Sequence, residues 1–355
     1  MASKLPKIDS EPGASGGTTG GSASTGEVLS PRRLELVAAG LDATLSNCKL
    51  VGISSAVEYQ IESGGKRLRP ALTLWFGELL DVVTETTLPL ALAVELLHNV
   101  FLVHDDIEDG DEFRRGRQTL WRAYGLPTAL NAADYLLAEA YRVQLEAPWP
   151  IETRVEIASL FTEVFRTTVE GQARDIVNRA SPTFTLAEYA AISARKTGRY
   201  LAFGWVGAAR LAGRDAKFCQ QLWDIGGQLG PAFQIRDDLL DLTAGKARGG
   251  EIGCDIREGK PSILYAFALD RATLSSADRE RLIAIHGQPR ETTDKRDVDW
   301  VIQLFHHCGA IEFAAAEARR QAADAVALFE RLPGIPPSAL PVFGQLAEFI
   351  VERKA

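Results

Sequence analysis

The chain has 355 residues, of which 46% are hydrophobic and 24% are charged, so it can bury a sizeable core as one or two domains. Its formal net charge of −8 argues against general nucleic-acid binding, because phosphate binding requires a basic face. The four cysteines lie far apart without the spacing of a metal site or a disulfide framework, which favours a reducing cytoplasm.

The N-terminal segment is predicted to be a disordered tail covering residues 1–27. From Glu11 to Gly26, twelve of sixteen residues are Gly, Ser or Thr, a composition that buries too little apolar surface to offset the entropy of ordering. The segment has no apolar core, so it is not a secretory signal. We also find no uncharged apolar run of about 18 residues, so we expect a soluble, cytoplasmic protein without a membrane span.

The remainder, residues 28–355, is predicted to be a single large all-α domain. Pro89 and Pro127 mark expected helix starts, where a missing backbone N–H has no cost. Leu222, Ile225 and Leu229 recur at helical spacing. No segment shows the sustained alternation of a strand, and no internal repeat is present.

The stretch "GGKRLRP" is the first basic cluster along the chain. It places Lys66, Arg67 and Arg69 after two glycines, on a turn that enters a helix. Taken alone, such a cluster is more often a solvated loop than a binding site.

The next segment, residues 88–103, is apolar nearly all round and is broken mainly by Glu95, His98 and Asn99. A helix of this kind belongs in the middle of a bundle. It leads directly into six acidic residues within residues 105–112. We therefore expect these carboxylates to open into an interior cavity.

Two acidic motifs share one spacing. In "DDIED", Asp105 and Asp109 share a helix face, with Asp106 about 100° round the axis. "FQIRDDLLD" repeats the arrangement with Asp237, Asp238 and Asp241. One such motif could be a solvated acidic face, but two copies on mostly apolar helices favour a box of carboxylates. Hard oxygen ligands of this kind suit Mg²⁺, whereas the loop spacing of an EF-hand calcium site is missing.

Further basic clusters follow the acidic motifs. They are "FRRGR" with Arg114, Arg115 and Arg117, "RKTGR" with Lys196 and Thr197, and "REGKPS" with Lys260. Arginine and lysine beside Mg²⁺ are suited to holding diphosphates, because guanidinium groups grip the oxygens bidentately. With no P-loop present, the set indicates a diphosphate substrate bound without a nucleotide fold.

The ordered set of "GGKRLRP", "FLVHDDIED", "RRG", "KTG", "FQIRDDLLD" and "DIREGKPS" resembles the trans-isoprenyl diphosphate synthase (polyprenyl synthetase) family across residues 30–350. The resemblance implies a helical bundle of the isoprenoid synthase type with a central active-site cavity, and a homodimer. It also implies a Mg²⁺-dependent prenyltransferase that condenses isopentenyl diphosphate with an allylic diphosphate.

Residue roles follow from this resemblance. Several Mg²⁺ ions, bound together with the substrate diphosphate, would be held by Asp105, Asp106, Asp109, Asp237, Asp238 and Asp241. The allylic diphosphate would contact Arg114, Lys196, Thr197, Gln234 and Lys260, and isopentenyl diphosphate would contact Lys66, Arg69, His98 and Arg115. The implied catalytic set is Asp105, Asp106, Asp109, Lys196, Asp237 and Asp238.

Product length in such a bundle depends on packing beside the first acidic motif. Phe101 lies one helical turn before Asp105, preceded by Val100 and Leu97, and these three side chains would form a floor for the growing chain. An aromatic floor favours a short product, with the C20 geranylgeranyl chain ahead of the C15 farnesyl chain.

Two alternatives remain beside this function. One is a terpene cyclase-like enzyme on the same fold, and the other is a non-catalytic regulatory subunit of a prenyl synthase. The sequence departs from the family pattern at Gly250, where relatives commonly carry a lysine that Lys246 or Arg248 could replace.

Overall fold

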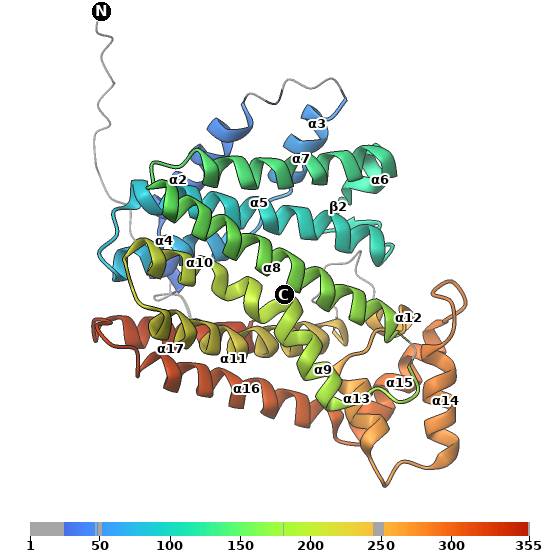
Figure 1. Ribbon diagram of the computed structural model, residues 1–355. Helices are drawn as coiled ribbons and strands as arrows, with labels where there is room; N and C mark the ends of the chain where they lie inside the picture. The colour runs from blue at the N-terminus through green and yellow to red at the C-terminus, as the bar shows by residue number, and fades with distance from the viewer. Residues whose placement is uncertain (1–24, 47, 49–51, 180, 244–251, 354–355) are drawn as a thin grey trace, which may run out of the picture.

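The computed structural model describes residues 25–46, 48, 52–179, 181–243 and 252–353. Throughout that part the chain is almost wholly helical (Figure 1), which confirms the all-α prediction. Most of the predicted tail lies outside the described residues. Its last three residues, 25–27, differ from the prediction because they belong to a short helix, α1 (Thr25–Val28).

Among the described residues, the first half of the fold holds eight helices in chain order. They are α1, α2 (Pro31–Leu45), α3 (Ser54–Glu62), α4 (Leu68–Leu79), α5 (Thr84–Glu108), α6 (Leu120–Tyr124), α7 (Leu126–Leu145) and α8 (Ile151–Val177). Pro127 stands in the first turn of α7, as predicted.

The second half begins with α9. A capping box between Thr185 and Glu188 stabilises the start of this helix. Its elements are α9 (Leu186–Ser193), the π-helix η1 (Ala194–Gly198), α10 (Arg199–Leu211), α11 (Ala216–Asp241), α12 (Cys254–Arg257), α13 (Ile263–Asp270), α14 (Ser276–His286), α15 (Lys295–His307), α16 (Ala310–Phe329) and α17 (Ala339–Glu352). Among described residues, the buried apolar side chains of both halves form one continuous cluster.

Helix α5 lies inside the bundle, packed against α2, α4, α7 and α10. By length and composition it could cross a membrane, but 72% of its most apolar window is buried by the rest of the protein. It is therefore a core helix, as its all-round apolar character predicts. The expected helix start at Pro89 is wrong, because α5 begins at Thr84 and contains this proline.

Helix α11 is the counterpart of α5 in the second half, and α10 packs against both. The N-cap Asp215 accepts a hydrogen bond of 2.8 Å from the backbone N–H of Phe218. Leu222, Ile225 and Leu229 are fully buried, which confirms the helical spacing read from the sequence. Both helices carry their acidic motif at the C-terminal end, where the helix dipole is already negative.

The only strands in the described ranges form a small hairpin that the sequence did not predict. Strand β1 (Phe113–Arg114) pairs antiparallel with β2 (Arg117–Gln118). The two residues between them, Arg115 and Gly116, have φ values of 53° and 76°, as a type I′ turn requires. The hairpin brings Arg114 to Asp106 near the end of α5, whereas Arg117 lies over the Tyr59 ring of α3 at 4.2 Å.

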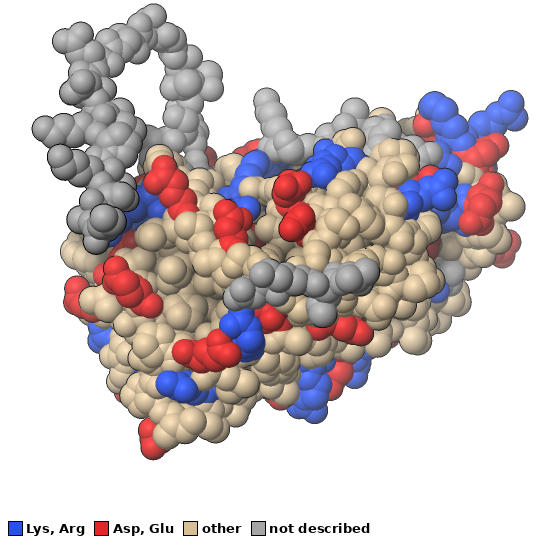
Figure 2. All heavy atoms as spheres, turned by 90° about the horizontal axis from the view of Figure 1, so that it is seen from above, with Lys and Arg blue, Asp and Glu red and all other residues tan. Residues whose placement is uncertain are grey.

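One face of the molecule is seen in Figure 2, from the side that is uppermost in Figure 1. Acidic and basic side chains are interspersed there within a larger uncharged surface. On this face the net charge is therefore not gathered into a single patch of either sign.

Candidate active site

A cavity of about 610 Å³ lies between the ends of α5 and α11, with walls from the hairpin, α8, η1 and α10. This volume is in the usual range of sites for small molecules. Twelve of the predicted site residues line it: Arg69, His98, Phe101, Asp105, Asp109, Arg114, Arg115, Lys196, Thr197, Gln234, Asp237 and Lys260. The fold thus brings both acidic motifs and all of the basic clusters to one cavity.

The first acidic motif divides its carboxylates between the cavity and the protein. Asp105 lines the cavity, and its carboxylate has no hydrogen bond or ion pair to any described residue. Asp106 is buried and accepts a hydrogen bond of 2.6 Å from Arg114 Nε. Burial raises the pKa of Asp106 to about 6, and the Arg114 guanidinium opposes that shift.

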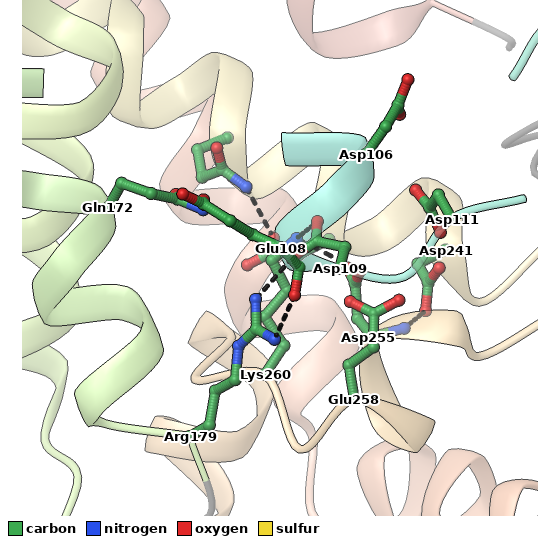
Figure 3. Close-up of polar contacts among 12 residues, drawn as sticks. Asp106, Glu108, Asp109, Asp111, Gln172, Arg179, Asp241, Asp255, Glu258 and Lys260 are labelled. Carbon is green, nitrogen blue, oxygen red and sulfur yellow. Dashed lines mark hydrogen bonds and ion pairs between the residues drawn. The ribbon is translucent and has the colours of Figure 1, made fainter. Parts of the chain in front are cut away.

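Asp109, at the end of α5, is surrounded by cationic side chains. Its carboxylate pairs with Arg179, its backbone oxygen accepts a hydrogen bond of 2.7 Å from Arg290, and Lys260 Nζ lies 3.9 Å from Oδ2. Figure 3 shows Arg179 and Lys260 reaching toward Asp109, while Asp106 points away from this group. These cations offset the negative charge that the helix end concentrates.

The second acidic motif is divided in the same way. Asp237 lines the cavity, and its partner is Arg353 beyond the end of α17. Asp238 is buried and accepts hydrogen bonds of 2.9 Å from the Tyr189 hydroxyl and 3.1 Å from the Ile263 backbone N–H. Asp241 accepts one of 3.0 Å from the Asp255 backbone N–H. Asp238 and Asp241 therefore tie α11 to its neighbouring segments.

The donor set at the cavity suits a hard cation. Asp105, Asp109 and Asp237 supply carboxylate oxygens, and open space remains around them for water and ligand oxygens. Within the described residues, no three His, Cys, Asp or Glu side chains are gathered closely enough to form a metal cage. Mg²⁺ seldom has such a cage, because it keeps several waters and takes substrate phosphates as ligands.

The basic part of the cavity is built around Arg69, Arg115 and His98. The Arg69 guanidinium lies 4.9 Å from the centre of the Tyr200 ring. Arg115 is held in the left-handed region at the hairpin turn, a conformation that non-glycine residues adopt mainly where the surroundings enforce it. Burial, and then the charges of Arg69 and Arg115, hold the pKa of His98 well below its usual range. The imidazole is therefore neutral at physiological pH.

Lys66 is placed apart from this group. Its side chain is exposed, with Nζ 5.0 Å from the centre of the Phe349 ring on α17, and it does not line the cavity.

Lys196 and Thr197 lie on η1, a π-helical turn of the kind often found at functional sites. Thr197 Oγ1 donates to Gln234 Oε1 at 3.4 Å. Glycines allow the neighbouring helices to approach this turn closely. A Cβ at Gly171 of α8 would lie 2.7 Å from the Lys196 nitrogen, and one at Gly230 of α11 would lie 2.4 Å from Gly198 Cα.

Aromatic rings form the apolar wall. Phe101 stacks on Phe165 with ring centres 5.8 Å apart, and meets Tyr200 edge-on at 5.2 Å. Leu97 and Val100 have exposed fractions of 0% and lie in the core, not among the lining residues. Of the three predicted floor residues, Phe101 is thus the one that faces the cavity.

Comparison with known proteins decides the family. The polyprenyl synthetase family model matches residues 51–305, well over half of the chain. The chain belongs to the polyprenyl synthetase family.

Relatives of this polyprenyl synthetase agree along nearly the whole chain. It is 32% identical over 321 residues to a geranylgeranyl pyrophosphate synthase from Geoglobus acetivorans, covering 90% of this chain and 97% of the relative. It is 34% identical over 301 residues to a short chain isoprenyl diphosphate synthase from Methanothermobacter thermautotrophicus, covering 84% and 90%. A crystal structure of a polyprenyl synthase from Caulobacter crescentus, complexed with calcium and isoprenyl diphosphate, has a TM-score of 0.80 at 27% identity, covering 95% of this chain and 100% of that one.

Family and relatives together make this polyprenyl synthetase a prenyltransferase. The cyclase and the non-catalytic subunit are not favoured, because the relatives found are named as synthases.

The sequence analysis missed several residues at the site. Gln172 of α8 lines the cavity and donates to Glu108 at 2.6 Å, and Asp175 is buried beside Lys196 and Asp238. Their motif, "GQARD", was visible as polar residues on one helix face. Tyr200 directly follows "RKTGR", so that motif could have pointed to it. Nothing in the sequence marks Arg179 or Arg353, which tertiary packing alone brings to Asp109 and Asp237. Lys246, Arg248 and Gly250 lie outside the described residues.

Proposed function

We propose that this enzyme condenses isopentenyl diphosphate with an allylic diphosphate to give a short all-trans prenyl diphosphate, with C20 favoured and C15 possible. The proposal rests on one observation above all. A single cavity is lined by carboxylates of both acidic motifs, by five basic side chains from distant segments and by an aromatic wall. The geranylgeranyl pyrophosphate synthase and short chain isoprenyl diphosphate synthase relatives support the short product.

Asp105, Asp109 and Asp237 are the residues we assign to Mg²⁺, because they face the cavity and carry hard oxygen donors. When bound together with the diphosphate, the ions would stabilise its developing negative charge as it leaves. Asp106, Asp238 and Asp241, which the resemblance also places at the metals, do not line the cavity and accept hydrogen bonds from the protein, so they would act by positioning the two helix ends. The Caulobacter relative, whose complex contains calcium and isoprenyl diphosphate, supports a divalent ion in this family.

The chain's own cations complete the allylic site. Arg114, Lys196 and Lys260 lie around the cavity with Thr197 and Gln234. They would hold the leaving diphosphate by charge-assisted hydrogen bonds, so that its charge is stabilised as the carbon–oxygen bond breaks. No enzymic nucleophile is needed for this ionisation.

Arg69, Arg115 and the neutral His98 would hold the diphosphate of isopentenyl diphosphate, and Lys66 is expected to join them from the exposed turn. The isopentenyl double bond then attacks the allylic cation, and loss of a proton gives a chain five carbons longer. Phe101, Phe165 and Tyr200 would exclude water from the cation and bound the growing chain.

We also propose that the enzyme works as a homodimer in the cytoplasm. Val155, Thr162, Val169 and Ile176 follow one another at seven-residue spacing on the exposed side of α8. Val155 is 57% exposed, Val169 45% and Ile176 39%, and Leu126 and Leu130 on α7 are exposed as well. A stripe of this kind fits a second copy of the chain, since self-association buries apolar surface on both copies.

The test is an elongation assay with purified protein, Mg²⁺ and labelled isopentenyl diphosphate, supplied in turn with dimethylallyl, geranyl or farnesyl diphosphate. We expect a discrete C20 or C15 alcohol after dephosphorylation. Hydrocarbon or cyclic alcohol in lanes that lack isopentenyl diphosphate would instead favour a cyclase. No product in any lane would contradict the proposal.

A further inference from the structure

Arg353 occupies a place in the site that the reaction outlined above does not explain. It follows the last residue of α17, at the C-terminal end of the described chain. Its guanidinium pairs with Asp237, the carboxylate of the second acidic motif that faces the cavity, and its centre lies 3.7 Å from the centre of the Phe233 ring. The Arg353 side chain is only 14% exposed.

The backbone of Arg353 is held from two sides. Its N–H donates to the Phe349 oxygen at 2.9 Å, which continues the last turn of α17. Its carbonyl accepts a hydrogen bond of 3.0 Å from Arg236 Nε on α11. The guanidinium is therefore delivered to Asp237 by the fold, and is not a loose terminal charge.

Most of the charges around Arg353 are positive. Arg69 lies over the same Phe233 ring at 5.4 Å, and Arg236 grips the adjacent backbone. Burial lowers the pKa of Arg353, Asp237 opposes that shift, and Arg69 and Arg236 add to it. If another cation takes the Asp237 carboxylate, the buried guanidinium loses the anion that stabilises it and requires a replacement.

The side chain also keeps an unused donor. Arg353 Nε is buried and has no hydrogen-bond partner among the described residues. A buried donor without a partner costs free energy until a ligand or water satisfies it. Arg69, which lies over the same Phe233 ring, also has a buried Nε without a partner among the described residues. Two arginines at one ring therefore have donor capacity that the described part of the protein does not use.

We propose that the Arg353 guanidinium neutralises Asp237 until the metal binds this carboxylate and displaces the guanidinium. The released guanidinium then binds the incoming diphosphate beside Arg69. The proposal rests on the proposed function, because that function supplies the metal and the diphosphate. Metal binding and isopentenyl diphosphate binding are then coupled. The diphosphate gives the displaced guanidinium a new anion, and the metal frees that guanidinium to bind the diphosphate.

The test compares Arg353→Gln with the matched control Arg319→Gln. Arg319 on α16 pairs with Glu352, the residue before Arg353, at 3.0 Å, and both of those side chains are exposed. Mn²⁺ alone is titrated into metal-free protein, and the free ion is followed by paramagnetic resonance. We expect Arg353→Gln to bind Mn²⁺ several-fold more tightly than the wild type, and Arg319→Gln to match the wild type.

Turnover supplies the second half of the test. Losing one charge-assisted contact should raise the KM for isopentenyl diphosphate by roughly ten-fold in Arg353→Gln, with a smaller change in kcat. Arg353→Lys keeps the charge that faces Asp237, so its Mn²⁺ affinity should return toward the wild-type value. This rescue separates the charge from a general disturbance of α17.

Unchanged Mn²⁺ affinity in a folded Arg353→Gln protein overturns the proposal, and so does an unchanged KM for isopentenyl diphosphate. The metal titration requires no turnover. Failure of the proposed function would instead appear as absence of product from the wild type in the elongation assay.

Discussion

Asp105 and Asp238 belong to motifs of identical spacing but have different surroundings. Asp105 lines the cavity and has no side-chain partner among described residues, whereas Asp238 is buried and joins α11 to Tyr189 and to the start of α13. A carboxylate without a protein partner is available to a ligand. One that already accepts three hydrogen bonds, the third from Gln234 at 3.2 Å, serves the fold as well.

Substituting these two residues separates their tasks. We expect Asp105→Asn to lower kcat by at least roughly a hundred-fold, because transition-state charge stabilisation is lost, while the thermal midpoint stays unchanged. Asp238→Asn should also destabilise the protein by about 1.5–3 kcal/mol, since its charge-assisted hydrogen bonds are weakened. Activity assays and thermal melts on both variants check this. Equal thermal midpoints for the two variants would show that Asp238 has no structural task.

Phe101 and Leu97 provide a comparable pair on α5. Phe101→Ala removes the ring that faces the cavity and should lengthen the product by at least one five-carbon unit. Leu97→Ala should cost about 2–5 kcal/mol of stability through a core cavity, with the product length unchanged. Chromatography of the dephosphorylated products measures the length. Longer products from Leu97→Ala would mean that the core, and not the aromatic wall, sets the limit.

His286 makes stability depend on pH. It is buried against Tyr265, with ring centres 4.0 Å apart, and burial lowers its pKa to about 4. Between its ordinary pKa of about 6.5 and this value the unfolded chain binds a proton that the folded protein does not, so stability falls as pH decreases through that window.

The contribution of His286 to this loss should reach about 3 kcal/mol at the acidic end. His286→Phe, which retains a ring against Tyr265, should flatten the pH dependence of urea unfolding between pH 7 and about pH 4. The exposed His306 supplies a control as His306→Gln. A pH slope that His286→Phe leaves intact would assign the acid sensitivity to other groups.

At the scale of elements, the site depends on how closely α8 and α11 approach η1. The glycines at these contacts leave no room for a Cβ, and the approach fixes Lys196 and Thr197 against the cavity. The hairpin acts in a similar way for Arg114 and Arg115, because its tight turn sends neighbouring side chains to different partners.

Two glycines of α11 allow this to be tested within one helix. A Cβ at Gly230 would meet the Gly198 backbone at 2.4 Å, whereas a Cβ at Gly227 meets nothing within 4 Å. Gly230→Ala should destabilise the protein by about 1–3 kcal/mol and raise the KM for the allylic diphosphate, because η1 must shift. Gly227→Ala should be neutral or stabilise by up to about 1 kcal/mol through helix propensity. Chemical denaturation and steady-state kinetics distinguish them, and similar behaviour of the two variants would argue against the close contact.

At the scale of the whole molecule, the apolar stripe on α8 would place the proposed dimer contact next to the site. Val169 and Ile176 belong both to the stripe and to the cavity wall. A second copy docked on this face would therefore lie next to the substrate. The rest of the fold explains why α5 can be so apolar without entering a membrane, since other helices cover most of it.

Val155→Glu places a charge at the N-terminal end of the stripe and should convert a dimer to a monomer. Val83→Glu introduces the same charge at a site 63% exposed just before α5 and is the control. Light scattering after size exclusion gives the mass directly. A monomeric wild type, or a dimer that survives Val155→Glu, would place the assembly surface elsewhere or remove it.

The sequence by itself determined the fold class, the helical character of the acidic segments and the residue types that gather at the candidate site. Helical periodicity and the Asp-Asp-x-x-Asp spacing are local properties, since residues three or four apart share a face whatever surrounds the helix. The residues that carry the family resemblance are local in the same sense. Twelve of the predicted site residues consequently line one cavity.

Only the tertiary structure decided which carboxylates are available. Asp109 and Asp241 hold the last position of equivalent motifs, yet Asp109 lines the cavity beside Arg179 and Lys260. Asp241 instead accepts a hydrogen bond from the backbone N–H of Asp255, 14 residues along the chain. The start of α5 before Pro89, the hairpin and the arrival of Arg353 at Asp237 have the same origin. Burial and charge at a site depend on distant segments that pack around it, and the spacing of residues along one helix does not predict which segments these are.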